Sequence, residues 1–420
     1  MYFDFSMFIE CQFRAFFKSR GTPYRLTVKR FFFLLGWLLV YIPAEVVNRL
    51  FFLLDEIFFP KYRQQEIREP IFIIGNPRSG TTFLHRLLYK DRETFTSFTV
   101  WELILAPSIT QRKIIWGLVK VGRWVGRPFQ RLAKGINRSL KQSRVNKTHA
   151  VRLAEAEEDE HIMMHAWASE TLFNLYPFLD KIFPYFYYDQ AIPKAKQAKL
   201  MRFYKSMLRR HLYAHGGDKI LLSKNPSYSS KVAALTEHFP DARFIKLVRN
   251  PFEAVPSMLN VMAMGLDIFC DPRDPYAYKS ELMDLMNHYY FYPVQFFEGR
   301  QEPFQIIRYS DLTQQPSQTV SDLYAWLGLA QSDSFKALVA ETTRTQRKYK
   351  SAHRYPLQKM GLSRQILFKT FEEVFRYYDF PTNEFELPER ELSRQKQGRT
   401  KAAQKERRRF PNGEQGKLPS

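Results

Sequence analysis

The sequence predicts an α/β fold in which helices flank a parallel β-sheet, and three observations support this prediction. Short apolar runs rich in β-branched and aromatic residues, typical of buried strands, occur at residues 71–74, 220–222, 244–248 and 304–307. Helical patterns such as 231–239 separate these runs, and strands that alternate with helices favour a parallel sheet covered on both faces. The chain of 420 residues is 45% hydrophobic and 16% aromatic, which suits one large domain with appendages, or two domains.

The first element is an apolar N-terminal region over residues 31–59. Its uninterrupted part, 31–42, is shorter than the roughly 20 apolar residues that a spanning helix needs, and four residues then interrupt it: Pro43, Glu45, Arg49 and Asp55. A secretory signal is not indicated, because the chain starts with bulky residues and shows no small-residue cleavage site after the apolar stretch. We expect two helices that lie in one membrane leaflet, flanked by Lys29 and Arg30. The alternative is that these helices only cover the domain that follows.

The next element, IFIIGNPRSGTTFLHRLL at 71–88, predicts a buried strand, a phosphate-sized loop and a helix. Gly75 ends the strand, and Gly80 permits a tight turn. Thr81 and Thr82 then open the helix. Because N–H groups are exposed at a helix N-terminus, a glycine-bearing loop in front of a helix forms an anion-binding site.

The loop has the glycine spacing of the nucleotide-triphosphatase P-loop, G-x-x-x-x-G-K-[ST], so we expect the sheet to be P-loop-like. Thr81, however, stands where that motif requires lysine. Without this lysine, and without a recognisable metal-binding aspartate, magnesium-dependent ATP hydrolysis lacks two of its usual parts. The loop cation is instead Arg78, whose guanidinium suits two oxygens of a phosphate or sulfonate. A nucleotide kinase or triphosphatase is therefore the alternative rather than the first interpretation.

Five segments resemble sulfotransferases, enzymes that use 3′-phosphoadenosine 5′-phosphosulfate (PAPS). The loop NPRSGTT at 76–82 resembles the 5′-phosphosulfate loop of that family, and FIKLVRNPFEAVPS at 244–257 resembles its 3′-phosphate signature. Three segments resemble elements of its broad bacterial-type branch: WELI at 101–104, LLSKNP at 221–226 and HRYPLQKMGL at 353–362. Because these matches follow in order over roughly residues 69–380, they are far more specific than the loop alone.

The resemblance implies how a PAPS site would be built. Arg78 would clamp the 5′-phosphosulfate together with the backbone N–H groups of four residues, Ser79, Gly80, Thr81 and Thr82. Arg249 and Ser257 would bind the 3′-phosphate that distinguishes PAPS from ATP. In better-known cytosolic relatives a lysine holds the place of Arg78, whereas an arginine resembles the carbohydrate-directed and bacterial branches.

Four further residues have weaker assignments. Tyr309, which follows a predicted strand, resembles a tyrosine that approaches the adenine, although a packed tyrosine explains it almost as well. Lys224 and Asn225 follow another strand and would face the sulfonate or the acceptor, with a structural role for Lys224 as the alternative. Arg354 would close over the nucleotide.

A general base is needed if the acceptor is a hydroxyl, which must lose its proton as the S–O bond forms. The acidic segment at 155–161 is the best source, and similar bacterial-type enzymes have a carboxylate cluster there. We favour Glu158, followed by Glu157 and His161; Glu102 and His85 are secondary candidates. The alternative is that these acids only begin a helix, predicted over 151–176, whose dipole favours them.

No metal is expected. His161 and His165 lie four residues apart, but Ile162 stands where the zinc-protease pattern needs a glutamate. Two cysteines, Cys11 and Cys270, cannot build a disulfide framework and permit a reducing compartment.

The formal net charge of +22 implies anionic partners. Basic residues recur every three or four positions over 123–141, which suits an anionic membrane surface or a merely solvated helix face. A further basic run at 401–409 lies in a tail that has too few apolar residues to fold. No nucleic-acid module accompanies it, so no nucleic-acid partner is expected.

Together these observations predict a cytoplasmic, membrane-associated sulfotransferase with three parts. Residues 1–68 form a membrane-associating helical segment, 69–388 the sulfotransferase domain and 389–420 a disordered basic tail. The reaction moves a sulfuryl group from PAPS to a hydroxyl or amine of a small molecule, carbohydrate or lipid, and releases the nucleotide PAP. A membrane scaffold with a degenerate nucleotide loop is the alternative from another class. The sequence predicts neither the acceptor's identity nor the oligomeric state.

Overall fold

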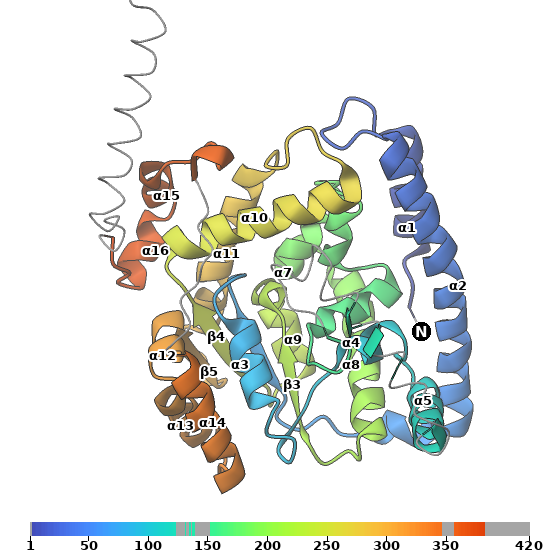
Figure 1. Ribbon diagram of the computed structural model, residues 1–420, viewed down its shortest axis with the longest axis vertical. Helices are drawn as coiled ribbons and strands as arrows, with labels where there is room; N and C mark the ends of the chain where they lie inside the picture. The colour runs from blue at the N-terminus through green and yellow to red at the C-terminus, as the bar shows by residue number, and fades with distance from the viewer. Residues whose placement is uncertain are drawn as a thin grey trace, which may run out of the picture. The chain divides into compact units, whose positions relative to one another are not determined.

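A five-stranded parallel sheet organises the first of two compact units, Met1–Phe371 and Glu372–Ser420. The computed structural model describes residues 2–122, 131, 134–135, 137–138, 152–346 and 357–382. All strand pairs are parallel, in the order β2 (Phe95–Thr96), β3 (Ile220–Lys224), β1 (Ile71–Gly75), β4 (Arg243–Val248) and β5 (Phe304–Arg308) (Figure 1). The predicted fold class is confirmed, and the carboxyl ends of all five strands meet at one edge, where ligands of such sheets bind.

The strands separate two hydrophobic cores, because successive side chains of a strand point to opposite faces. Phe72 and Ile74 of β1 pack in one core with residues of α8 (Lys194–Ala214) and α9 (Val232–His238). Ile71 and Ile73 pack in the other core with residues of α3 (Thr81–Leu88), α12 (Tyr309–Gln314), α13 (Pro316–Leu327) and α14 (Asp333–Gln346). All five residues of β1 are buried, as its unbroken apolar sequence predicts.

The remaining elements include one departure from the predicted helices. The helix predicted over 151–176 is wrong: this stretch forms two 3₁₀ helices, η3 (Asp159–Ala166) and η4 (Glu170–Asn174). Trp167 ends η3 in the left-handed region, with φ of +52°, so the chain turns instead of continuing. The others are η1 (Pro60–Gln64), α4 (Val100–Ile104), α5 (Ile109–Gly122), η5 (Phe183–Tyr187), α7 (Tyr188–Ala191), η6 (Pro226–Ser230), α10 (Pro251–Cys270), α11 (Lys279–Phe297), η7 (Leu357–Met360), α15 (Arg364–Thr370) and, in the second unit, α16 (Glu372–Tyr377).

Three expectations fall mostly outside the described residues. The basic helix face over 123–141 is described only at 131, 134–135 and 137–138, which are helical. Arg354 and the tail over 389–420 lie outside the described part altogether.

The N-terminal region forms α1 (Phe5–Phe17) and a single 31-residue helix, α2 (Val28–Phe58). The expectation of two helices over 31–59 is therefore wrong, since α2 continues through Pro43. A proline inside a helix removes one backbone hydrogen bond. The residues around it are held from the protein side: the Tyr41 hydroxyl donates to the carbonyl of Met164 at 2.8 Å, and Glu45 Oε2 lies 2.8 Å from His165 Nδ1. These contacts fix the helix on both sides of the proline.

Polar residues of α2 bind the rest of the first unit along one face. Asn48 Oδ1 accepts a hydrogen bond from Gln111 Nε2 at 2.8 Å. The buried carboxylate of Asp55 accepts from the backbone N–H groups of Ile109 and Thr110 at 3.0 and 2.8 Å, and from Arg210 Nε at 3.1 Å. Asp55 thus caps the start of α5 and neutralises an arginine of α8, so α2 is fastened to two other helices.

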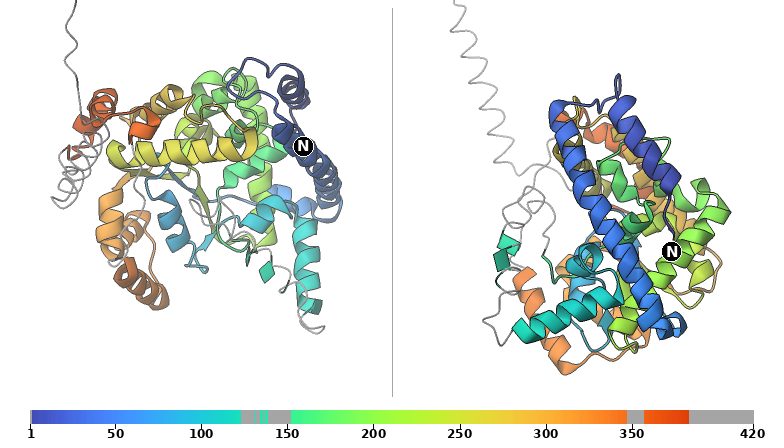
Figure 2. Two further views of the ribbon diagram at one scale, coloured as in Figure 1. Left: turned by 45° about the horizontal axis from the view of Figure 1, so that its top comes forward. Right: turned by 90° about the vertical axis from the view of Figure 1, so that its right-hand side faces the viewer.

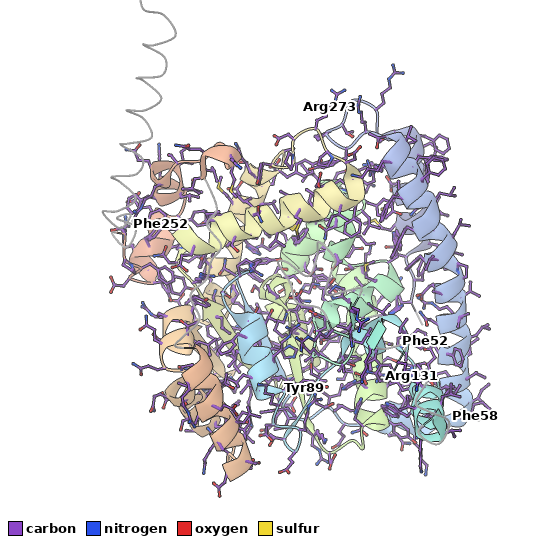
Figure 3. All side chains as sticks on the ribbon, in the orientation of Figure 1. Phe52, Phe58, Tyr89, Arg131, Phe252 and Arg273 are labelled. Carbon is purple, nitrogen blue, oxygen red and sulfur yellow. The ribbon has the colours of Figure 1, made fainter. Side chains whose placement is uncertain are left out.

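The opposite face of α2 is apolar and exposed. Leu39 and Ile57 are each 68% exposed, and on α1 Phe17 is 75% exposed. Figure 2 (right) shows α1, α2 and α5 together on this side, and Figure 3 shows Phe52 on the inner side of α2 and Phe58 on its outer side. Within the described residues, two helices are long and apolar enough to cross a membrane, α2 and α10; half of the apolar window of α10 is buried, but only 22% of that of α2.

Candidate active site

The loop between β1 and α3 has a shape that two glycines permit. Gly75 has φ of +133°, and a Cβ atom there would overlap the carbonyl of Leu247 on β4, so only glycine keeps the two strands paired at this point. Gly80 has φ of +92°, and its Cβ would lie 2.8 Å from the ring of Tyr309. Arg78, between them, has φ of +70°, a left-handed conformation uncommon for a residue with a side chain.

Hydrogen bonds fix the loop from within. The hydroxyl of Ser79 donates to the carbonyl of Asn76 at 2.6 Å, and Asn76 Nδ2 donates to the carbonyl of Met286 on α11 at 3.0 Å. α3 begins at Thr81, and the first N–H groups of a helix have no acceptor within the helix. The N–H of Ser79 donates within the loop to the carbonyl of Asn76 at 3.2 Å, so in the predicted clamp at 79–82 it is the backbone of Gly80, Thr81 and Thr82 that offers donors at the carboxyl edge of the sheet.

Two arginines that are distant in sequence meet at this loop. Arg78 Nε donates to Ser257 Oγ at 3.0 Å, and Arg249 Nη1 donates to the backbone carbonyl of Arg78 at 3.0 Å. The guanidinium of Arg249 also lies 4.0 Å from the centre of the Tyr309 ring. The structure therefore brings together four residues that the sequence singled out, although it does not test their roles as nucleotide contacts.

The helix that follows β4 explains the position of Ser257. Asn250 caps α10 by accepting a hydrogen bond from the N–H of Phe252 at 2.9 Å, and Pro251 occupies the first helical turn, where its missing N–H costs nothing. Ser257, two turns into α10, is buried and faces Arg78. Arg249 is anchored by Glu253, one turn along the same helix, which accepts from Arg249 Nε at 2.6 Å.

A second group of residues lies where β3 ends beside β1. Lys224 Nζ donates to Glu158 Oε1 at 2.5 Å and to the hydroxyl of Thr82 on α3 at 3.3 Å. The Lys224 side chain is fully buried, whereas the Glu158 side chain is 27% exposed. Lys224 thus connects the favoured base to the first turn of α3.

Buried polar contacts hold Glu158 in place from behind. The neighbouring Asp159 accepts hydrogen bonds from the hydroxyls of Tyr204 and Ser223, the latter at 2.9 Å. Burial raises the pKa of Asp159 to about 6, although both hydroxyls oppose the rise. Ser223 precedes Lys224 on β3, so the hydrogen bond between Ser223 and Asp159 places Glu158 beside Lys224.

The other candidate bases have structural partners. Glu157 is buried, and a carboxylate oxygen lies 3.7 Å from the guanidinium of Arg86 on α3. His161 Nδ1 lies 2.8 Å from the carbonyl of Glu158, at the start of η3. His85 is buried beside Ser97, and burial, together with nearby Lys224, lowers its pKa to about 3. Of these candidates, His161 alone is partly exposed.

Asn225 and Glu102 cap short helices. Asn225 Oδ1 accepts from the N–H of Ser227 at 3.1 Å, which supports a structural role for this side chain. Glu102 accepts from the N–H of Thr99 at 2.9 Å and lies 2.6 Å from His215 Nε2. Burial raises the pKa of Glu102, but the positive charge of nearby Arg112, the strongest influence among its neighbours, helps to hold that pKa well below its usual range.

One set of described side chains resembles a metal site. Glu102, His211 and His215 bring three ligand atoms within 4.8 Å of one another. Arg112, however, places a guanidinium nitrogen 3.2 Å from His211 Nδ1 and another 3.9 Å from Glu102. Its positive charge already neutralises the carboxylate, so the group fits an ion-pair network better than a cation site.

Comparison with known proteins identifies the family. The model of the sulfotransferase family matches residues 70–333, more than half of the chain. Two curated proteins named omega-hydroxy-beta-dihydromenaquinone-9 sulfotransferase Stf3, from Mycobacterium bovis and Mycobacterium tuberculosis, are 26% identical to it over 292 residues. This match covers 63% of the chain and 64% of those relatives, so the chain spans less than two thirds of their length.

Solved structures agree with this result at the level of the fold. Sulfotransferase STF9 from Mycobacterium avium superposes with a TM-score of 0.70 at 18% identity, covering 90% of this chain and 93% of its own. Sulfotransferase STF1 from Mycobacterium tuberculosis superposes with a TM-score of 0.62 at 19% identity, covering 87% and 92%. Since the family match includes β1, the loop of Arg78 and the turn of Arg249, the chain belongs to the sulfotransferase family.

Proposed function

We propose that this enzyme transfers a sulfuryl group from PAPS to a hydroxyl or amine of an acceptor and releases PAP. The observation that carries the proposal is the meeting of Arg78, Ser257 and Arg249, linked by hydrogen bonds of 3.0 Å, at the carboxyl edge of the sheet. A loop for the 5′-end of a nucleotide does not by itself account for Arg249. A second arginine with a serine beside it suits a nucleotide that carries a further phosphate on its ribose.

The donor contacts follow from this arrangement. Arg78 and the N–H groups of 80–82 would hold the 5′-phosphosulfate, and Arg249 with Ser257 would hold the 3′-phosphate. Tyr309, which already packs against Gly80 and the guanidinium of Arg249, would lie against the adenine. Because sulfuryl transfer resembles phosphoryl transfer, these contacts act by positioning the donor and by stabilising negative charge on the departing phosphate.

Glu158 serves as the general base in this proposal. As the acceptor oxygen attacks, a new S–O bond forms, the S–O bond to PAP breaks, and the acceptor proton passes to Glu158. Lys224, 2.5 Å away, orients the carboxylate and connects it to Thr82 beside the phosphosulfate loop.

Transfer of labelled sulfate from PAPS tests the reaction directly. The wild type should transfer label in the presence of EDTA, which would stop a magnesium-dependent kinase or triphosphatase. Glu158→Gln should lower kcat by about 10²- to 10⁴-fold with little change in the KM for PAPS, because a positioned base contributes that much. Glu66→Gln, on an exposed side chain, is the matched control. Absence of transfer by the wild type would refute the reaction, and a normal kcat for Glu158→Gln would refute only the base.

We also propose a lipid-like acceptor and association with the cytoplasmic face of a membrane. Support comes from the relatives named for a menaquinone and from the exposed apolar face of α1 and α2. The polar contacts of Glu45, Asn48 and Asp55 favour a helix that lies in the plane of the leaflet, since crossing would break them. Mass spectrometry of lipid extracts from cells with and without the gene should reveal species heavier by one sulfo group; identical extracts would contradict the acceptor class.

A further inference from the structure

A basic pocket lies next to the apolar face of α2. It has a volume of about 250 Å³ and is formed by α2, α8 and the start of the chain, with Tyr2, Phe52, Glu56, Lys199, Arg202 and Arg210 among its lining. The chain start and α2 both lie on the side turned toward the viewer in Figure 2 (right), and α2 carries many of the exposed apolar residues.

The charges in this pocket leave two cations available. Lys199 and Arg202 are exposed, lie one turn apart on α8, and take part in no ion pair or hydrogen bond among the described residues. Arg210 is already paired with Asp55 and Glu56. Glu56 is further occupied by Arg63 and Tyr62, so it does not compete for the two free cations.

The inner wall of the pocket is apolar. Phe52, Phe203 and Met207 line it and are almost completely buried. A cationic rim over an apolar wall fits a ligand that has an anionic group joined to hydrocarbon.

We propose that this pocket binds the phosphate headgroup of an anionic phospholipid in the leaflet on which α1 and α2 lie. On α2 itself, Leu53 follows the buried Phe52, lies about 100° round the helix from it and is half exposed, so the apolar outer face of α2 begins beside the pocket wall. The phosphates of the leaflet would then lie level with Lys199 and Arg202. The pocket would fix the rotation of the catalytic body on the membrane, a role separate from sulfuryl transfer.

Vesicle binding tests the inference. Wild-type protein should bind vesicles of phosphatidylcholine with phosphatidylglycerol more tightly than vesicles of phosphatidylcholine alone. The double variant Lys199→Glu/Arg202→Glu should lose at least about 25-fold in binding to the anionic vesicles, since each basic residue near such a surface contributes about fivefold and each glutamate adds repulsion. The control Lys336→Glu/Arg344→Glu changes the same charge on exposed residues of α14, which Figure 1 shows on the far side of the sheet from α2, and should bind like the wild type.

A soluble lipid separates a headgroup pocket from general surface charge. Dihexanoyl phosphatidylglycerol below its micellar concentration should bind the wild type, and Ser206→Phe, which fills the pocket without changing its charge, should abolish this binding. Equal vesicle binding by all variants would overturn the proposal. Inorganic phosphate that binds as tightly as the short-chain lipid would also overturn it in favour of a free-anion site. Unchanged affinity of every variant for PAP, measured by calorimetry, would show that a failure here leaves the proposed donor site intact.

Discussion

At the scale of single residues, the proposed donor site depends on two arginines that contact each other through the main chain. Arg249 donates to the carbonyl of Arg78, so the position of each guanidinium depends on the other turn. Arg78, with its left-handed backbone, lies in the loop proposed to hold the reacting 5′-phosphosulfate. Arg249 contacts Glu253 and Tyr309 and is proposed to hold the 3′-phosphate, away from the reacting sulfur. The two residues should therefore fail in different ways when truncated.

Arg78→Ala should lower kcat by 100-fold or more, because it removes charge stabilisation that develops only in the transition state. Arg249→Ala should instead raise the KM for PAPS about 10- to 100-fold with a smaller change in kcat, since it removes a charge-assisted contact present throughout. Steady-state kinetics with PAPS varied measures both. Near-normal kinetics in both variants would remove the proposed site.

The fold should be sensitive to acid at His85. Its pKa of about 3 lies below the ordinary value near 6.5, chiefly because burial disfavours the charged ring. Its contribution to stability is therefore complete above about pH 6.5 and is lost as the pH falls toward 3. His85→Gln can keep the hydrogen bond to Ser97. Below pH 6.5, the free energy of unfolding of this variant should fall by up to about 1.4 kcal/mol less per pH unit than that of the wild type. Urea unfolding at pH 7.5 and 5.5 tests this, and parallel curves for the two proteins would contradict it.

The sequence identified individual site residues where a motif carried them, as for Arg78, Arg249 and Ser257. The contact between Lys224 and Glu158 was not predictable, because the two residues are 66 positions apart and meet only when the segment before η3 packs against β3. Two signals were available, a lysine at a strand end and an acidic run, but neither indicates the other as its partner.

At the scale of elements, the strands were predictable and the irregular segments were not. β1 and β4 are buried on both faces; the apolar run of β1 is continuous, and that of β4 from Phe244 to Val248 is interrupted only by Lys246, so both indicate strands directly. The stretch over 151–176 looked helical, yet its acids are held by tertiary partners such as Tyr204 and Ser223. Such contacts override local helix propensity, and no periodic pattern records them.

Gly75→Ala tests how tightly β1 and β4 approach each other. Because a Cβ atom would overlap the carbonyl of Leu247, we expect no soluble folded protein, or a loss above about 4 kcal/mol in the free energy of unfolding. The matched change Gly36→Ala, in α2 with nothing within 4 Å of the added Cβ, should be neutral or stabilise by up to about 1 kcal/mol. Expression and thermal melting compare the two variants, and a stable Gly75→Ala protein would show that the strands can separate here.

Asp55→Ala tests the attachment of α2. Removing the carboxylate leaves Arg210 without one of its acids and α5 without its cap, so the loss should be about 3–5 kcal/mol. Asp333→Ala, on a side chain that is 98% exposed, should change stability by less than about 0.5 kcal/mol. Urea unfolding measures both, and equal effects would mean that Asp55 contributes nothing specific.

At the scale of the whole molecule, an apolar N-terminal face was predictable from composition, but its attachment was not. The sequence indicated two short helices broken by Pro43, whereas α2 runs through the proline because contacts with Met164 and His165 hold it. Removing residues 1–60 would delete Asp55 and its contacts, so the role of the exposed face is better tested by surface substitutions.

Leu39→Glu/Leu50→Glu should move the protein from the membrane fraction to the soluble fraction, because it places two charges on the exposed face. The melting temperature should stay nearly unchanged, since both side chains are more than half exposed. Ile366→Glu, on exposed α15, is the control. Membrane recovery equal to that of the wild type would contradict association through α2.

The fastening of α2 has a consequence for how the chain is made. His165, a partner of Glu45, is synthesised 120 residues after it, and Arg210, a partner of Asp55, is synthesised 155 residues after Asp55. At about 5–20 residues per second, a ribosome needs roughly 6–30 s to supply them. During that interval α2 has left the exit tunnel before its partners in the catalytic half are synthesised, and its apolar face is accessible to a chaperone or to the bilayer.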